Sequence, residues 1–186
     1  MTEIGERYQK VAGAFTDTAR AVPGGAWDNP APCEGWVARD VVRHLVEWVP
    51  PFLQNGAGVK WPDVPSVDDD PVAAWQTTNN AIQAILDDPD QSARKFHNQH
   101  TGTHRLDEAI AMFILGDVLV HTWDLARAAG LDENERLDAD EVHRMVVGIE
   151  PMGDVLEKSG QYGARVPVAD DVDEQTRLLA LTGRRV

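Results

Sequence analysis

The stretch LDEAIAMFILGDVLVHTWDLARAAG, residues 106–130, decides the fold of this chain. Its apolar residues recur three and four positions apart, as on one face of a helix. Gly130 follows the last of them, where a helix C-cap belongs. The spacing therefore predicts one continuous helix from Leu106 to Ala129. A long helix with an apolar face needs partners to cover that face, so we expect other long helices around it.

Those partners are predicted on both sides of this stretch. Asp70-Pro71 is a strong helix start signal, with Asp as the N-cap and Pro at the first helical position. Asp138 followed by Glu141 has the spacing of a capping box. Strand signals are weak, and only VPVAD (166–170) is expected to be extended. The predicted helices cover 2–21, 37 to Pro50-Pro51 or just beyond, 71–87, a segment from 138, and a short one around 173–183, with 55–70 as a surface connection.

Composition and charge limit the classes of function. With 186 residues the chain is expected to form a single domain, 1–186. Its 17 basic and 31 acidic residues give a net charge of −14, which argues against a nucleic-acid partner. Cys33 is the one cysteine, so no intramolecular disulfide can form. No run is as apolar as a membrane span, and the N-terminus lacks an apolar signal core, so we expect a cytoplasmic protein without a membrane partner.

Three polar residues interrupt the apolar face of the 106–129 helix. Asp117 and His121 are four positions apart and Asp124 is three further on, so all three point the same way. Burying an unpaired carboxylate is costly, so something must compensate these groups. A protonated His121 between two aspartates would do so, and so would a divalent cation bound to Asp117 and His121. The first alternative is a buried salt-bridge network without metal.

The second predicted helix offers a third ligand for such a cation. His44 shares its face with Val41, Leu45 and Trp48, so it is also expected to face the core. Two histidines and a carboxylate are a common ligand set for a divalent metal, and they leave a position open for water or substrate.

Three segments resemble one protein family. PCEGWVARDVVRHLVEW (32–48), GDVLVHTWDLARAAG (116–130) and YGARVPVADD…RLLALTGR (162–184) resemble the DinB/YfiT-like metal-binding bundles. The similarity is to the actinobacterial branch that includes the N-terminal domain of mycothiol-dependent maleylpyruvate isomerase. It implies an all-α, up-down four-helix bundle with additional short C-terminal helices. It also implies a zinc or nickel ion bound by His44, Asp117 and His121.

The resemblance also has two departures. The isomerase has a second, C-terminal domain that contributes to catalysis and for which 186 residues leave no room, so isomerisation of maleylpyruvate is not implied. Val37 stands where the family commonly has a Thr or Ser that caps the second helix. The loss of that cap is expected to cost about 1 kcal/mol without affecting the metal.

Other polar residues receive simpler interpretations. Asp124 is expected to hold a metal ligand or a bound water by a hydrogen bond, or to cap a neighbouring backbone group. In an enzyme, Asp124 as the catalytic candidate, or a loop histidine, would manage protons. Asp40 suits the positive end of its helix. Cys33 is interpreted as a small, half-buried residue without a base nearby. The histidines at 97, 100 and 104 lie in the polar stretch FHNQHTGTH and are expected to be exposed, although one of them could reach the mouth of the site.

The resemblance favours one of three functions. In the first, the protein is a thiol-dependent transferase or isomerase, in which mycothiol is deprotonated at the metal and adds to a small electrophile. In the second, it is a metal-dependent hydrolase that uses a metal-bound water. In the third, the metal is structural and the protein is a non-catalytic binding module. The expected partners are a small thiol and a small electrophilic substrate, and a homodimer is left open as the assembly.

Overall fold

The computed structural model describes residues 2–153, 155, 158, 160 and 162–186. Four long helical segments form a bundle: α1 (Glu3–Ala21), α2 (Ala38–Ala57), α3 (Pro71–Asp87) and a segment from Leu106 to Ala129 that ends in α6 (Gly116–Ala129). The helical-bundle fold expected from the sequence is confirmed. Short elements connect or follow these helices: η1 (Gly24–Ala26), α4 (Pro89–Ser92), η3 (Asp132–Glu135), α7 (Ala139–Ile149), η4 (Glu150–Met152) and α9 (Glu174–Leu181).

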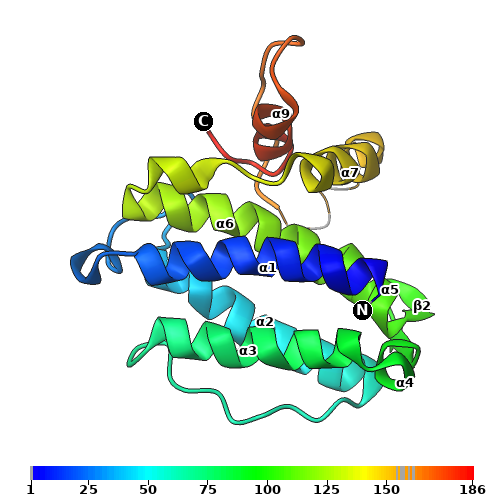
Figure 1. Cartoon of the computed structure of the whole chain (residues 1–186). Helices are drawn as coiled ribbons and strands as arrows, with labels where there is room; N and C mark the ends of the chain where they lie inside the picture. Colours follow the sequence, from blue (N-terminus) through cyan, green and yellow to red (C-terminus); the bar gives the residue numbers. More distant parts are fainter. Residues whose placement is uncertain (1, 154, 156–157, 159, 161) are drawn as a thin grey trace.

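The order of the helices in space differs from their order along the chain. α1 packs against α3 and α6, and α2 packs against the same two helices from the other side. Figure 1 shows α1 and α2 running in opposite directions, but α3 running the same way as α2, so the helices do not alternate in direction as in the expected up-down order. The long connection 58–70 makes this possible, because it returns along the whole length of the bundle before α3 begins (Figure 1). As a result α2 and α6 are neighbours, and the two helices with inward polar residues face each other.

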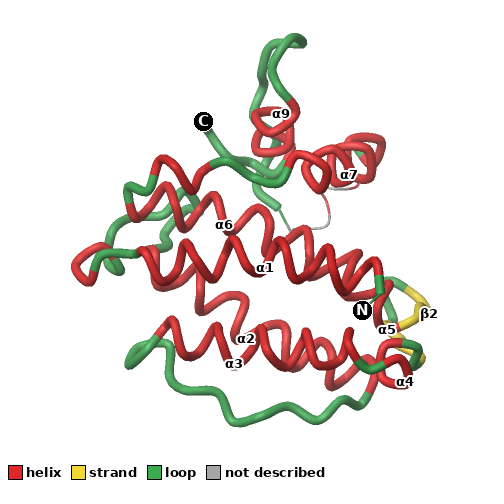
Figure 2. Tube along the Cα trace, in the orientation of Figure 1, coloured by secondary structure: helices red, strands yellow, loops and turns green. Residues whose placement is uncertain are grey.

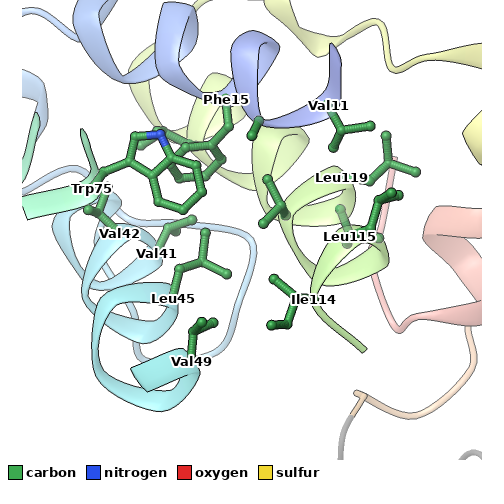
Figure 3. Close-up of a cluster of buried hydrophobic side chains, with 14 of the residues drawn as sticks. Val11, Phe15, Val41, Val42, Leu45, Val49, Trp75, Ile114, Leu115 and Leu119 are labelled. Atoms are coloured by element: carbon green, nitrogen blue, oxygen red, sulfur yellow. The ribbon is translucent and has the colours of Figure 1, made fainter. Parts of the chain in front are cut away.

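The core lies between the inward faces of these four helices. Figure 3 shows Leu45 of α2 pointing towards Ile114, with Phe15 of α1 and Trp75 of α3 closing the cluster. All four side chains are fully buried. The indole Nε1 of Trp75 donates a hydrogen bond to the hydroxyl of Thr16 at 2.9 Å, which satisfies the polar atom of this large side chain. The core thus fixes the spacing of α2 and α6.

The helix predicted over 106–129 has the expected ends but not a uniform geometry. It begins as α5 (Leu106–Ala109), continues as the π-helical η2 (Ile110–Leu115) and becomes α6, whose C-cap Gly130 has φ +69°. The wider π turn shifts the register of the face just before Asp117, and such turns are frequent at functional sites. By length and hydropathy this helix could cross a membrane, which corrects the expectation that no run is as apolar as a membrane span. However, 72% of its most apolar window is buried inside the protein, as for a core helix.

Helix α2 is longer than the sequence predicted. It continues through Pro50 and Pro51 to Ala57, and Gly58 then caps it with φ +62°. Leu53, beyond both prolines, is completely buried, so packing of the apolar face holds the helix together where the missing amides weaken it. Asp70 caps α3 by accepting a hydrogen bond from the amide of Ala73, as predicted.

The expectation for strands was wrong at both places. β1 (Lys95–Asn98) and β2 (Gly102–Arg105) form an antiparallel hairpin around the polar stretch FHNQHTGTH, where no strand was predicted, and Figure 2 shows it in yellow at one end of the bundle. Phe96 anchors the hairpin because its side chain is fully buried. Residues 166–170, predicted to be extended, belong to no strand.

The C-terminal helices α7 and α9 pack against each other and lie beside α6, away from α3 (Figure 1). Asp138 caps α7 through the amide of Glu141, as predicted. The second half of the predicted capping box is not made, because the Glu141 carboxylate instead accepts two hydrogen bonds from Arg7 of α1, at 2.6 and 2.8 Å. Asp173 caps α9, which confirms the short final helix.

Candidate metal centre

His44 of α2 meets Asp117 and His121 of α6 inside the bundle. His44 Nε2 lies 3.2 Å from Asp117 Oδ2, and His121 Nε2 lies 3.4 Å from Asp117 Oδ1. One ligand atom from each residue lies within 4.8 Å of the other two. The structure therefore brings together the three residues that were predicted as metal ligands. Their role as ligands remains a prediction.

The exposed fraction of the side chain decreases from His44 through Asp117 to His121. His44 is 32% exposed, Asp117 18% and His121 5%. Solvent therefore reaches the cluster from the side of α2, while His121 forms its floor. Two surface hollows of the protein, both lined by Arg136 and Leu137, share no residue with this cluster.

Two tryptophans orient and cover the cluster. The indole Nε1 of Trp48, one turn after His44, donates a hydrogen bond to Asp117 Oδ2 at 2.9 Å. Trp36 stacks on the ring of His121, with 5.8 Å between ring centroids and 20° between planes, and its ring also contacts His44. Trp48 was expected on the inward face that it shares with His44, whereas Trp36 was missed, because it lies in a loop where helical periodicity gives no direction.

His121 has a second carboxylate on its other side. Its Nδ1 lies 2.8 Å from Asp124 Oδ2, and Asp124 is completely buried. Asp124 thus holds the His121 ring by a hydrogen bond, as predicted from the spacing on the helix. With Nδ1 occupied in this way, His121 Nε2 is the nitrogen that faces Asp117 and His44.

A second group of possible ligands shares His121. Cys33, from the loop before α2, lies with its Sγ 3.5 Å from Asp124 Oδ2, so Cys33, His121 and Asp124 also come within metal-ligand reach. Arg184 stands in this group, however, with Nη2 2.7 Å from Asp124 Oδ2 and 3.5 Å from Cys33 Sγ. A guanidinium already supplies the positive charge there, so the group with His44 is the better metal site.

The structure corrects the prediction for Cys33 and adds Arg184 to the surroundings of the site. Cys33 was expected to have no base nearby, but it contacts a buried carboxylate. Arg184 was not singled out at all, although only 8% of it is exposed. Their partners are about 90 and 60 residues away along the chain, so spacing could not reveal either contact. The sequence offered one signal of such a partner: Asp124 lies on the buried face of its helix, and the positive charge of His121 alone cannot balance both Asp117 and Asp124.

The electrostatics of the metal-free cluster follow from its burial. Burial opposes ionisation of Asp117, but His121 and then His44 outweigh it and hold the pKa of Asp117 below its ordinary value of 3.8. Burial alone would lower the pKa of His121, but Asp117 and Asp124 raise it well above 6.5. Burial likewise opposes the charge on Asp124, and His121 and Arg184 keep its pKa low. Without metal, His121 is an imidazolium between two carboxylates.

This charge pattern fits a divalent cation. The proton on His121 Nε2 occupies the space between His121, Asp117 and His44, and a cation could replace it and keep both carboxylates compensated. Two imidazoles and one carboxylate are borderline donors of the kind that zinc prefers. The residues present therefore fit the metal that the sequence resemblance implies.

The remaining candidates lie outside the cluster. His97 and His100 are exposed and His104 is half-buried on the hairpin, where it contacts Thr101 and the ring of Phe113. Asp40 accepts a hydrogen bond from the amide of Val37 at 3.0 Å, which agrees with its predicted role at the helix start.

Tyr162 is a further group near the cluster that the sequence reading missed. Burial, together with the charge of Asp117, raises the pKa of Tyr162 to about 12, and Arg184 acts against this rise. The phenol therefore keeps its proton at neutral pH. Tyr162 comes from the segment before α9, so the C-terminal part of the chain contributes to the surroundings of the cluster.

Comparison with known proteins shows the family of this chain. Residues 8–126 match the family model described as the mycothiol maleylpyruvate isomerase N-terminal domain, a match that includes all of α2 and most of α6. No curated protein and no solved structure matches the chain. The matched region contains His44, Asp117, His121 and Asp124, and Arg184 lies outside it. The chain belongs to the family of the mycothiol maleylpyruvate isomerase N-terminal domain, which is DinB/YfiT-like.

Proposed function

We propose that this protein binds one divalent metal ion, with zinc as the best fit, through His44, Asp117 and His121, and is a thiol-dependent transferase or isomerase. The observation that carries the proposal is the meeting of three ligand atoms from two helices within 4.8 Å. Family membership supports the use of mycothiol as the thiol, because the family is described by a mycothiol-dependent enzyme.

The charge of the ligand set favours a thiol as co-substrate. Two neutral histidines and one aspartate leave a net charge of +1 on a divalent site, which attracts an anionic fourth ligand. A bound cation would lower the pKa of a thiol at the open position and keep it in the reactive thiolate form. The substrate would then be a small electrophile that accepts the sulfur.

The surrounding side chains have separate tasks in this proposal. Trp48 holds the Asp117 carboxylate in place by its indole N–H. Trp36 covers the ring of His121 and limits the access of water to the floor of the site. Asp124 holds the proton at His121 Nδ1, so that Nε2 stays free for the metal. Tyr162 could exchange protons with the reacting molecules directly, whereas the buried Asp124 could do so only through the ring of His121.

Metal binding is tested first. Protein purified without a His tag should contain about one metal ion per chain, measured by elemental analysis. His44→Ala and His121→Ala should each lose it, because three protein ligands are needed for tight binding. His143→Ala is the matched control, since His143 is 61% exposed and pairs only with Glu174 among the described residues. Equal metal content in all four proteins would refute the proposed ligands.

Thiol binding is tested on the cobalt-substituted protein. Titration with mycothiol should change the visible absorption spectrum, because sulfur would enter the coordination sphere of the ion. A non-thiol analogue, in which a hydroxyl replaces the sulfhydryl group, should leave the spectrum unchanged. If mycothiol also leaves it unchanged, the thiol-dependent function is wrong, and ester hydrolysis without thiol would then indicate that bound water is the nucleophile.

A further inference from the structure

The C-terminal segment places a buried arginine against the candidate metal centre. The guanidinium of Arg184 donates from Nε to Asp124 Oδ1 at 3.2 Å and from Nη2 to Asp124 Oδ2 at 2.7 Å. Its Nη1 donates to the backbone carbonyl of Thr182 at 2.7 Å. Such a two-pronged contact fixes the plane of a carboxylate, which a single ammonium group cannot do.

Local backbone geometry explains how Arg184 reaches this place. α9 ends at Leu181, and Gly183 adopts φ +86°, which turns the chain back towards α6. The amide of Arg184 then donates to the carbonyl of Leu179 at 2.7 Å. A Cβ on Gly183 would lie 2.7 Å from the Cα of Gly163, so this turn packs directly on the loop that carries Tyr162.

A chain of contacts leads from Arg184 to the proposed metal ligands. Arg184 holds both oxygens of Asp124, and Asp124 Oδ2 holds Nδ1 of His121. His121 Nε2 faces Asp117 on the other side of the ring. The contacts that join Arg184, Asp124 and His121 are buried, so little solvent competes with them, whereas Asp117 at the end of the chain is 18% exposed.

We propose that Arg184 is a positioning residue of the metal centre, which acts through Asp124 on the ring of His121 and thereby couples metal binding to docking of the C-terminal segment. The inference rests on the proposed metal site. Because coupling between two equilibria is reciprocal, the factor by which docking of the segment strengthens metal binding is the factor by which metal strengthens docking. The family-matched region, 8–126, would then be incomplete as a metal site without residues beyond it.

The first test measures zinc affinity by competition with a chromogenic chelator. Arg184→Gln should bind zinc about 10 to 100 times more weakly than the wild type, the usual effect of losing a group that orients a ligand. Arg184→Lys keeps the charge without the two-pronged contact and should fall between the two. Arg185→Gln is the matched control, because Arg185 is exposed, and it should bind zinc like the wild type.

A double-mutant comparison separates positioning from a general loss of stability. If Arg184 acts through Asp124, Asp124→Asn combined with Arg184→Gln should bind zinc no more weakly than Asp124→Asn alone. Two losses that multiply would overturn the proposed route. Where Arg184→Gln does not fold, as judged by circular dichroism, the comparison is made with Arg184→Lys, and a wild-type affinity for zinc in that variant also overturns the inference.

The second test reads docking of the C-terminal segment without any activity assay. Zinc should slow the removal of residues 184–186 by carboxypeptidase in the wild type and have little effect in Asp124→Asn. If the wild type binds no zinc in the competition assay, the proposed function fails. If it binds zinc but trimming proceeds at the same rate with and without zinc, the coupling fails while the proposed function stands.

Discussion

His121 is the residue on which the candidate site depends, because each of its ring nitrogens has a separate carboxylate partner. Nδ1 contacts Asp124 at 2.8 Å and Nε2 contacts Asp117 at 3.4 Å. The shorter contact is on the fully buried side, where Arg184 fixes the carboxylate. The longer one is on the side open to His44. This asymmetry assigns a holding role to one nitrogen and a binding role to the other.

The hydrogen bond from Trp48 to Asp117 gives a prediction for a single residue. Trp48→Phe keeps an aromatic ring but removes the N–H that orients the carboxylate at 2.9 Å. Zinc affinity, measured by chelator competition, should fall about tenfold. Trp61→Phe is a suitable control, because the buried indole nitrogen of Trp61 has no hydrogen-bond partner within the described part of the chain. An equal change in both variants would show that orientation of Asp117 does not matter.

Two glycines within helices differ in what surrounds them, and substitution by alanine should therefore have opposite effects. At Gly56 of α2 a new Cβ would lie 2.0 Å from the buried ring of Phe96, so Gly56→Ala should destabilise the protein by about 1–3 kcal/mol through overpacking. At Gly13 of α1 a new Cβ would meet no described atom within 4 Å apart from the adjoining helix backbone, so Gly13→Ala should stabilise the protein by about 0.5–1 kcal/mol. Urea unfolding measures both, and the same sign for both would contradict this explanation.

The start of α2 has only one of the two hydrogen bonds of a capping box. The amide of Val37 donates to the carboxylate of Asp40, but the Val37 side chain cannot return a hydrogen bond to the helix. Val37→Thr should complete the capping box and raise the free energy of unfolding by about 1 kcal/mol. Val37→Ala, which adds no hydroxyl, should give no such gain in the same urea unfolding experiment.

For the molecule as a whole, the periodic spacing of apolar residues predicted the helices and the faces that they turn towards the core. The bundle and the inward face with His44, Asp117 and His121 follow from regular spacing, and the start of α3 follows from the Asp70-Pro71 signal. Features set by packing between distant segments could not be read in this way. Continuation of α2 past Pro51 depends on burial of Leu53, and the hairpin depends on burial of Phe96.

The same limit applies to the surroundings of the site. Trp36 and Arg184 reach the cluster from a loop and from a turn after a helix, where no repeat indicates direction. A buried histidine between two aspartates is compatible with both a bound cation and a salt-bridge network. The preference for a cation therefore came from the resemblance to a family.

The stability of the whole metal-free protein should depend on pH in a way set by this cluster. The pKa of Asp117 and that of Asp124 are lowered on folding, so their contribution is present above the ordinary value of 3.8 and is lost as pH falls through the folded-state values. The pKa of His121 is raised on folding, so its contribution is complete below 6.5 and is lost as pH rises above it. The cluster therefore contributes most between these two values.

Above pH 6.5 the metal-free and metal-bound proteins should behave oppositely. When a chelator keeps the protein free of metal, the free energy of unfolding should fall as pH rises, by up to about 1.4 kcal/mol per pH unit, until His121 loses its proton in the folded state. Zinc affinity should rise over the same range, because the metal must displace that proton. Urea unfolding at several pH values measures the first effect and chelator competition the second. His121→Gln should abolish the fall in stability, whereas His143→Gln should retain it. If the stability of the metal-free wild type increases between pH 6.5 and 9, His121 does not carry a proton between the two aspartates, and a cation has no proton to replace there.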